Sequence, residues 1–170
     1  MGCGKTTLGK CLAQKLGFSF IDVDLFLENR YRKSINQIFE EYGESGFRQI
    51  ENKILNEIVG FENTIVSTGG GLPCFFDHME LMNQHGTTIY LKVDVEELAN
   101  RLETQMSTRP LLKDKTREEL NDFIRENLTK REPYYSKAKL IVSAENLFTK
   151  KDINDRVDNL ILHLEKQAIL

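Results

Sequence analysis

Residues 2–7 read Gly-Cys-Gly-Lys-Thr-Thr, and this short stretch decides how the rest of the chain is interpreted. It matches the last part of the phosphate-loop pattern G-x-x-x-x-G-K-[ST]. Glycines let backbone N–H groups turn toward a phosphate, and the helix that follows offers the positive end of its dipole. In such a loop Lys5 reaches the β- and γ-phosphates, and the Thr6 hydroxyl holds Mg²⁺. The residues predicted to bind ATP are Gly2, Cys3, Gly4, Lys5, Thr6 and Thr7.

The pattern is incomplete on its amino-terminal side. Its first glycine would fall two positions before Met1, so the strand that precedes such a loop is not in the sequence either. A capped helix that merely begins with glycines explains the same residues. The downstream sequence has to decide between the two interpretations.

Strand and helix patterns alternate along the rest of the chain, which predicts an α/β fold with a parallel sheet between layers of helices. No linker rich in Pro, Gly or Ser interrupts residues 1–170, so we expect a single domain. The polar stretch 103–115 contains Arg109-Pro110 and is predicted to be a loop that closes as a lid over phosphates. Strands are predicted at 18–23, 64–67, 87–93 and 140–142, and helices at 8–16, 34–43, 45–58, 75–84, 94–102, 116–131 and 153–164.

Composition excludes several classes of protein. A net charge of -3 argues against a general nucleic-acid binder, which needs a basic face. No apolar run approaches the roughly 18 residues of a membrane span. Three cysteines in no Cys-x-x-Cys pair are typical of free thiols in a reducing compartment. We therefore expect a cytoplasmic monomer with a small-molecule substrate and no nucleic-acid or membrane partner.

Two aspartates, Asp22 and Asp24, follow the first predicted strand at its carboxyl end, the sheet edge where ligands bind in open α/β folds. Strand alternation predicts that both side chains point to one face. One carboxylate could complete a metal site while the other orients or deprotonates an acceptor hydroxyl. The alternative is that both aspartates cap the next helix.

Glycines and arginines supply the remaining candidates. Gly69–Gly71 follows a strand directly, which favours close approach of the backbone to a ligand over a plain turn. Arg48 and Glu51 lie three residues apart on a helix, so Glu51 can brace an arginine that grips a substrate carboxylate, although such pairs are commonly surface ion pairs. Arg109 and Arg131 are candidates to bind anions, but each also has an ordinary explanation. Arg109 could be a solvated loop residue, and Arg131 could be a cation that interacts with the dipole at a helix end.

Six fragments, taken in order, resemble the shikimate kinase family. Their order and spacing are specific, and the resemblance covers nearly the whole chain up to about Val142. The fragments are Gly-x-Gly-Lys-Thr-Thr from Gly2, Phe-Ile-Asp-Val-Asp from Phe20, Ile-Phe-x(4)-Glu-x(2)-Phe-Arg-x(2)-Glu from Ile38, Ser-Thr-Gly-Gly-Gly from Ser67, Arg-Pro-Leu-Leu from Arg109 and Lys-Arg-x-Pro-x-Tyr from Lys130.

The resemblance implies a P-loop kinase fold of the nucleoside-monophosphate-kinase type. It implies phosphoryl transfer from Mg-ATP to the 3-hydroxyl of shikimate, in the biosynthesis of aromatic amino acids. Asp24, Lys5 and Arg109 would be catalytic, with Asp24 activating the hydroxyl and Arg109 reaching in from the lid. Thr6 and Asp22 would serve the metal. The implied shikimate site consists of Asp24, Arg48, Arg131, Gly69, Gly70 and Gly71, with Phe39 and Phe47 as its walls.

The same resemblance places the missing first strand at the centre of the sheet. Because its absence would leave both neighbouring strands with unpaired backbone groups, we expect about ten native residues before Met1. Other small P-loop kinases, such as those acting on gluconate, and a non-catalytic P-loop binding module remain the alternatives.

Overall fold

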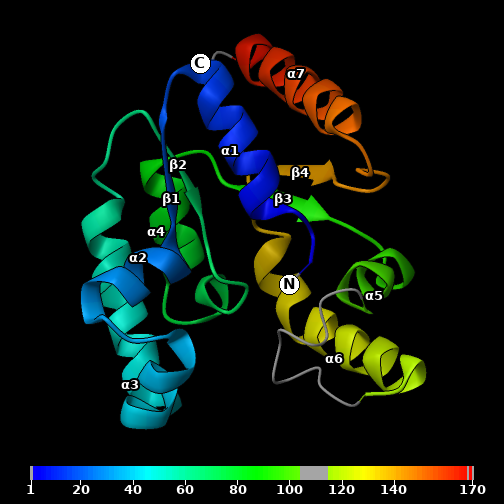
Figure 1. Ribbon diagram of the computed structural model, residues 1–170. Coiled ribbons are helices and arrows are strands. Elements are labelled where there is room, and N and C mark those ends of the chain that lie inside the picture. Colours follow the sequence, from blue (N-terminus) through cyan, green and yellow to red (C-terminus); the bar gives the residue numbers. More distant parts are fainter. Residues whose placement is uncertain (1, 104–114, 168, 170) are drawn as a thin grey trace.

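The computed structural model describes residues 2–103, 115–167 and 169, and along them short strands alternate with helices (Figure 1). The elements are α1 (Lys5–Leu16), β1 (Ser19–Asp22), α2 (Val23–Tyr31), α3 (Ile35–Ile58), β2 (Thr64–Ser67), the 3₁₀ turn η1 (Leu72–Cys74), α4 (His78–His85), β3 (Ile89–Lys92), α5 (Val95–Glu103), α6 (Arg117–Tyr135), β4 (Leu140–Ser143) and α7 (Lys150–Lys166).

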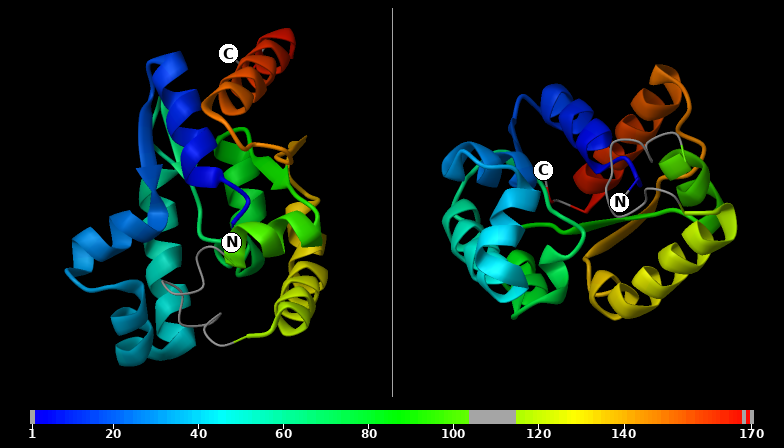
Figure 2. Two further views of the ribbon diagram at one scale, coloured as in Figure 1. Left: turned by 45° about the vertical axis from the view of Figure 1, so that its right-hand side comes forward. Right: turned by 60° about the horizontal axis from the view of Figure 1, so that its bottom comes forward.

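The four strands form two parallel pairs. In one pair β1 runs beside β2 with Asp22 opposite Ser67, and in the other β3 runs beside β4 with Ile89 opposite Leu140. Figure 1 shows α1 between the two pairs, and Figure 2 shows α1 and α7 on one side of the strands with α4 and α6 on the other. Parallel strands between two layers of helices confirm the predicted α/β class.

A cavity of about 370 Å³ separates β2 from β3. All of β2 and residues 89–91 of β3 line it, together with Leu8 and Leu12 of α1. In the described part of the chain no strand ladder joins the two pairs, so the facing edges of β2 and β3 lack a strand neighbour. This is the place where the sequence analysis expects the central strand.

Apolar packing divides into two clusters on either side of this cavity. One cluster joins α1 to β3, β4 and α5–α7, and the other joins α2 and α3 to Leu72 beyond β2. Local signals fix the helix ends: Ser34 and Thr116 form capping boxes with Gln37 and Glu119. No helix in residues 2–103 or 115–167 has the length and apolar character needed to cross a membrane.

The structure corrects several predicted boundaries. The strand predicted at 18–23 ends at Asp22, and the unpredicted helix α2 follows because the Asp22 side chain caps it by accepting from the Leu25 N–H at 3.5 Å. The two helices predicted at 34–43 and 45–58 form one element, α3, kinked at Gly43 with φ 65°. Helix α6 continues past Arg131 to Tyr135, and α4 begins only at His78, after η1.

Candidate active site

The phosphate loop leads directly into α1 and leaves the amino end of this helix open. Gly4 occupies the N-cap position with a left-handed backbone (φ 91°), which favours glycine, and no side chain caps the helix. No acidic residue lies in its first turn. The unpaired N–H groups and the positive end of the helix dipole therefore face outward, as an anion-binding site requires. Lys5 lies beside this opening, with its Nζ 3.7 Å from the Cys3 Sγ.

Two oxygen-bearing side chains meet next to the loop. The Thr6 hydroxyl donates a hydrogen bond of 2.9 Å to Asp22 Oδ2, which links α1 to the end of β1. Hydroxyl and carboxylate oxygens suit Mg²⁺, which takes few protein ligands and keeps waters and phosphate oxygens as the others. The described residues contain no group of three or more His, Cys, Asp or Glu side chains that could hold a metal.

Asp24 reaches the site from the first turn of α2, and not from the end of a strand as the alternation argument predicted. Protein atoms around its carboxyl group displace water and raise its pKa, the negative charge of Asp22 raises it further, and Lys5 partly opposes both effects. The influence of Lys5 shows that Asp24 lies within electrostatic reach of the phosphate loop. A carboxylate with a raised pKa is better suited to accept a proton at neutral pH than an ordinary one.

The Arg48–Glu51 pair is buried, which excludes the surface ion pair. Glu51 is 2% exposed and accepts a hydrogen bond of 2.5 Å from Arg48 Nη1. Burial raises the pKa of Glu51, whereas its contact with Arg48 lowers it, and burial is the larger effect. Within the described residues Arg48 Nε is buried and has no hydrogen-bond partner. One donor of this guanidinium therefore makes no hydrogen bond within the described residues.

Aromatic rings enclose the same guanidinium. Phe39 and Phe47 stack with their centroids 4.1 Å apart, and the Arg48 guanidinium carbon lies 5.3 Å from the Phe47 centroid. The Phe75 ring, which the sequence analysis missed, is nearer still at 4.0 Å. Rings that exclude water strengthen the attraction of this cation for an anion.

The glycine segment packs so tightly that side chains would collide with these groups. A Cβ built on Gly69 would lie 2.9 Å from Asp24 Oδ1, and one on Gly71 would lie 2.8 Å from Arg48 Nη1. Neither glycine has a positive φ, so space and not backbone conformation excludes larger residues. The segment is anchored behind by buried His78, whose ring nitrogens contact Leu72 O at 2.8 Å and Asn52 Oδ1 at 3.0 Å.

Arg131 approaches the glycine segment from α6. It lines the central cavity together with Gly69 and Gly70, and its charge acts on Cys74 directly after the segment. Tyr135, one helical turn further on, donates a hydrogen bond of 2.5 Å to Gly70 O. The sequence analysis included Tyr135 in a family fragment but gave it no role, because nothing local indicates a contact with a residue so distant in sequence.

The structure therefore gathers most of the predicted site residues at the carboxyl ends of β1 and β2. Asp24 and the Arg48–Glu51 pair face the glycine segment, and the phosphate loop lies within electrostatic reach of Asp24. Arg109 and positions 104–114 of the predicted lid lie outside the described residues.

Comparisons with known proteins agree with this arrangement. A family model described as shikimate kinase matches residues 1–161. A shikimate kinase of Parabacteroides distasonis is 53% identical over 164 residues, covering 96% of this chain and 94% of the relative. The crystal structure of a shikimate kinase from Bacteroides thetaiotaomicron superposes with a TM-score of 0.94 at 45% identity, covering 97% of this chain and 94% of the other. One from Acinetobacter baumannii, solved in complex with shikimate, has a TM-score of 0.84 at 30% identity, covering 100% and 91%. In sequence and in fold, the chain belongs to the shikimate kinase family.

Proposed function

We propose that this chain transfers the γ-phosphoryl group of ATP to the 3-hydroxyl of shikimate, giving shikimate 3-phosphate and ADP. One observation carries the proposal. A carboxylate with a raised pKa (Asp24) and an arginine held by a buried carboxylate (Arg48, bonded to Glu51) face one glycine segment, and the Thr6–Asp22 hydrogen bond links the phosphate loop to the turn before Asp24. A substrate that has both a hydroxyl and a carboxylate matches these two groups.

On the nucleotide side, the backbone N–H groups of residues 2–7 and the amino end of α1 hold the phosphates. Lys5 pairs with the β- and γ-phosphate oxygens. Mg²⁺, held by Thr6 and Asp22, supplies charge neutralisation on the phosphates when it is bound. By the family resemblance, Arg109, which lies outside the described residues, would add a second cation at the phosphates.

On the acceptor side, Asp24 orients the hydroxyl and takes its proton as the phosphoryl group is transferred. The guanidiniums of Arg48 and Arg131 bind the carboxylate, with Glu51 holding Arg48 in place. The backbone of Gly69–Gly71 closes around the ring. Phe39 and Phe47 form a wall that lowers the local dielectric and so strengthens the ion pairs.

We further propose that residues 1–170 act as one domain, a monomer that works in the cytoplasm without nucleic acid or membrane. The net charge of -3 supports the absence of a nucleic-acid partner. A single cooperative unit is supported by α1, which contacts β1 and β2 and also contributes Leu8 and Leu12 to the apolar cluster that contains β3 and β4.

The test is ADP release from Mg-ATP with shikimate, gluconate or AMP supplied in turn. Release that depends on shikimate alone supports the proposed reaction, and release with gluconate instead would indicate the gluconate-type kinase. A chain that binds Mg-ATP but is inactive with every acceptor would be the non-catalytic module. Binding itself is measured by the rise in the melting midpoint with each ligand.

A second version of the chain serves as the control for an inactive result. Extending it upstream of Met1 by about ten residues that favour a strand would fill the cavity between β2 and β3 and pair their free edges. Activity that appears only with the extension assigns the defect to folding. If the extended protein is inactive as well, the enzyme proposal fails.

A further inference from the structure

Tyr135 lies where two parts of the acceptor site meet. It is the last residue of α6, and its hydroxyl donates a hydrogen bond of 2.5 Å to the Gly70 carbonyl, 65 residues away in the sequence. Gly70 is the middle residue of the segment whose neighbours contact Asp24 and Arg48. A single phenol hydrogen thus ties the end of α6 to the segment that closes around the substrate.

Arg131 lies one turn earlier on α6, and both side chains line the central cavity. Burial raises the pKa of Tyr135, and the nearby positive charge of Arg131 partly opposes this effect. The phenol therefore keeps its proton at neutral pH and donates it to the Gly70 carbonyl. Its hydrogen is already used, so Tyr135 is not free to donate it to a ligand.

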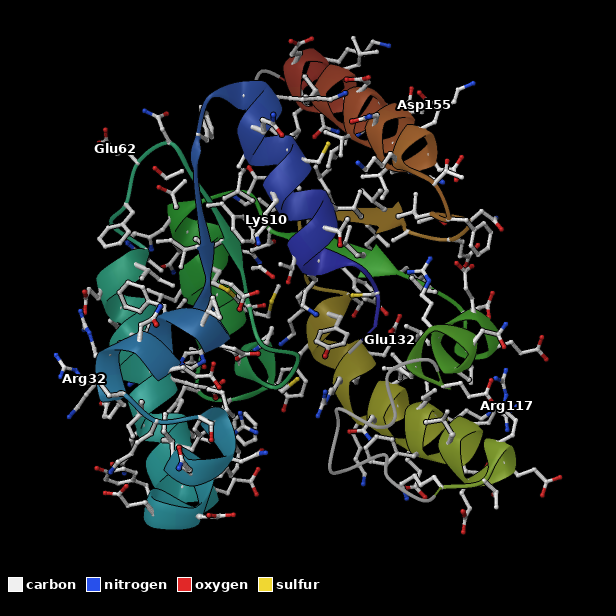
Figure 3. The ribbon with its side chains drawn as sticks, viewed as in Figure 1. Lys10, Arg32, Glu62, Arg117, Glu132 and Asp155 are labelled. Carbon is white, nitrogen blue, oxygen red and sulfur yellow. The ribbon has the colours of Figure 1, made fainter. Side chains whose placement is uncertain are left out.

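A second tyrosine fixes the ring from the other side. The Tyr90 and Tyr135 rings are tilted by 44° with centroids 5.1 Å apart, and the Tyr90 hydroxyl donates to Glu132 at 2.8 Å. Figure 3 labels Glu132 near the carboxyl end of α6. Tyr90 therefore has the same chemistry and packs against the same ring, but its hydroxyl points to Glu132 and contacts neither Gly70 nor Arg131 in the described hydrogen bonds.

We propose that Tyr135 is a positioning residue for the acceptor site, which sets the Gly70 backbone and the Arg131 guanidinium at the separation that binds the substrate carboxylate. The proposal rests on the proposed function, since it names what holds that site in register. Without the hydroxyl, the Gly70 carbonyl loses a donor, and the end of α6 that carries Arg131 loses its hydrogen bond to the glycine segment. The hydrogen bonds of the described residues connect this hydroxyl to Gly70 and not to the phosphate loop, so we expect its loss to act on the acceptor side first.

The test compares Tyr135→Phe with Tyr90→Phe, which remove one oxygen each from two rings in contact. For Tyr135→Phe we expect the KM for shikimate to rise about five- to tenfold, the effect of one well-placed hydrogen bond, and the KM for ATP to change less than about twofold. Tyr90→Phe should leave both KM values within about twofold of the wild type. Shikimate alone should raise the melting midpoint of Tyr135→Phe less than that of the other two proteins.

Each outcome has a distinct meaning. Equal KM values for the two variants, or a lower melting midpoint in Tyr135→Phe without any change in KM, would overturn the proposal and leave a structural hydrogen bond. Equal increases in the KM for ATP and for shikimate would also overturn it. If the wild type releases no ADP with shikimate, the proposed function fails, and the melting shift with shikimate still decides whether Tyr135 positions a binding site.

Discussion

Gly69→Ala tests the acceptor site most directly, because it displaces the Asp24 carboxylate without replacing any of the proposed functional residues. The added Cβ would lie 2.9 Å from Asp24 Oδ1 and 3.6 Å from Glu51 Oε1. Ordinary contacts of a Cβ begin at about 3.4 Å, so the Asp24 carboxylate has to retreat by roughly 0.5 Å. The backbone at Gly69 is not left-handed, so alanine adds no conformational strain.

This displacement has a predictable size in the kinetics. A misplacement of about 1 Å in a reacting group can cost about 100-fold in rate, so a shift of half that size should lower kcat about 10-fold or more. The KM for ATP should stay within about twofold. Gly71→Ala should differ, because its Cβ would lie 2.8 Å from Arg48 Nη1, and there the KM for shikimate should rise more than kcat falls.

The matched control is Gly60→Ala, in the turn after α3. Its Cβ would have no neighbour nearer than a backbone oxygen at 3.9 Å. Steady-state kinetics of all three variants, with their melting midpoints, complete the test. If Gly69→Ala keeps the kcat of the wild type, Asp24 is not the group that orients the hydroxyl. If the two site variants lose kcat and raise KM alike, the separate roles given to Asp24 and Arg48 are wrong.

Three further predictions follow from the same geometry. Asp24→Asn should lower kcat at least about 100-fold. Because the folded-state pKa of Asp24 lies above its ordinary value of 3.8, the wild type loses stability as the pH rises from 3.8 through the folded-state pKa. Urea unfolding across this pH range should show a smaller loss of stability in Asp24→Asn. Glu51→Ala should destabilise the fold by about 1.5–3 kcal/mol, since it removes the charge-assisted hydrogen bond from Arg48 and leaves this guanidinium the longer contact with Glu44 at 3.5 Å, and denaturant titration measures this. Thr6→Val should raise the Mg²⁺ concentration needed for half-maximal ADP release while leaving the KM for shikimate unchanged, and an unchanged Mg²⁺ dependence would remove Thr6 from the metal site.

Local signals in the sequence predicted most of the elements. Capping boxes placed the beginnings of α3 and α6 at Ser34 and Thr116, because a side chain that bonds a backbone N–H three residues on acts only within its own turn. Gly17 ended α1 for a similarly local reason, its left-handed backbone. The phosphate loop was identified in the same way, from residues adjacent in the chain.

Sequence reasoning was wrong at Asp24 for a local reason, because Asp22 caps a helix there, and Asp24 reaches the site from the first turn of α2. Capping was the alternative that the sequence left open. Other contacts were missed because they come from distant elements. The contact of Phe75 with Arg48 and that of Tyr135 with Gly70 join residues far apart in the chain. No periodicity or propensity encodes such a pairing, which depends on how η1 and α6 pack against the rest.

The unfavourable features of the free acceptor site are the ones that its ligand would correct. Asp24 and Glu51 come from different helices, and the charge of Asp24 raises the pKa of Glu51. Arg48 compensates Glu51 but keeps a buried Nε without a partner in the described residues. A substrate carboxylate beside the Arg48 guanidinium would add a charge-assisted hydrogen bond, and a substrate hydroxyl beside Asp24 would give its carboxylate a hydrogen bond in place of lost water. These unfavourable features lower the stability of the free protein. A single ligand that carries both the carboxylate and the hydroxyl should therefore gain more binding free energy than the sum for two ligands that each carry one of these groups. For the same reason, we expect position 69 to favour glycine, since a Cβ there would lie 2.9 Å from Asp24 Oδ1.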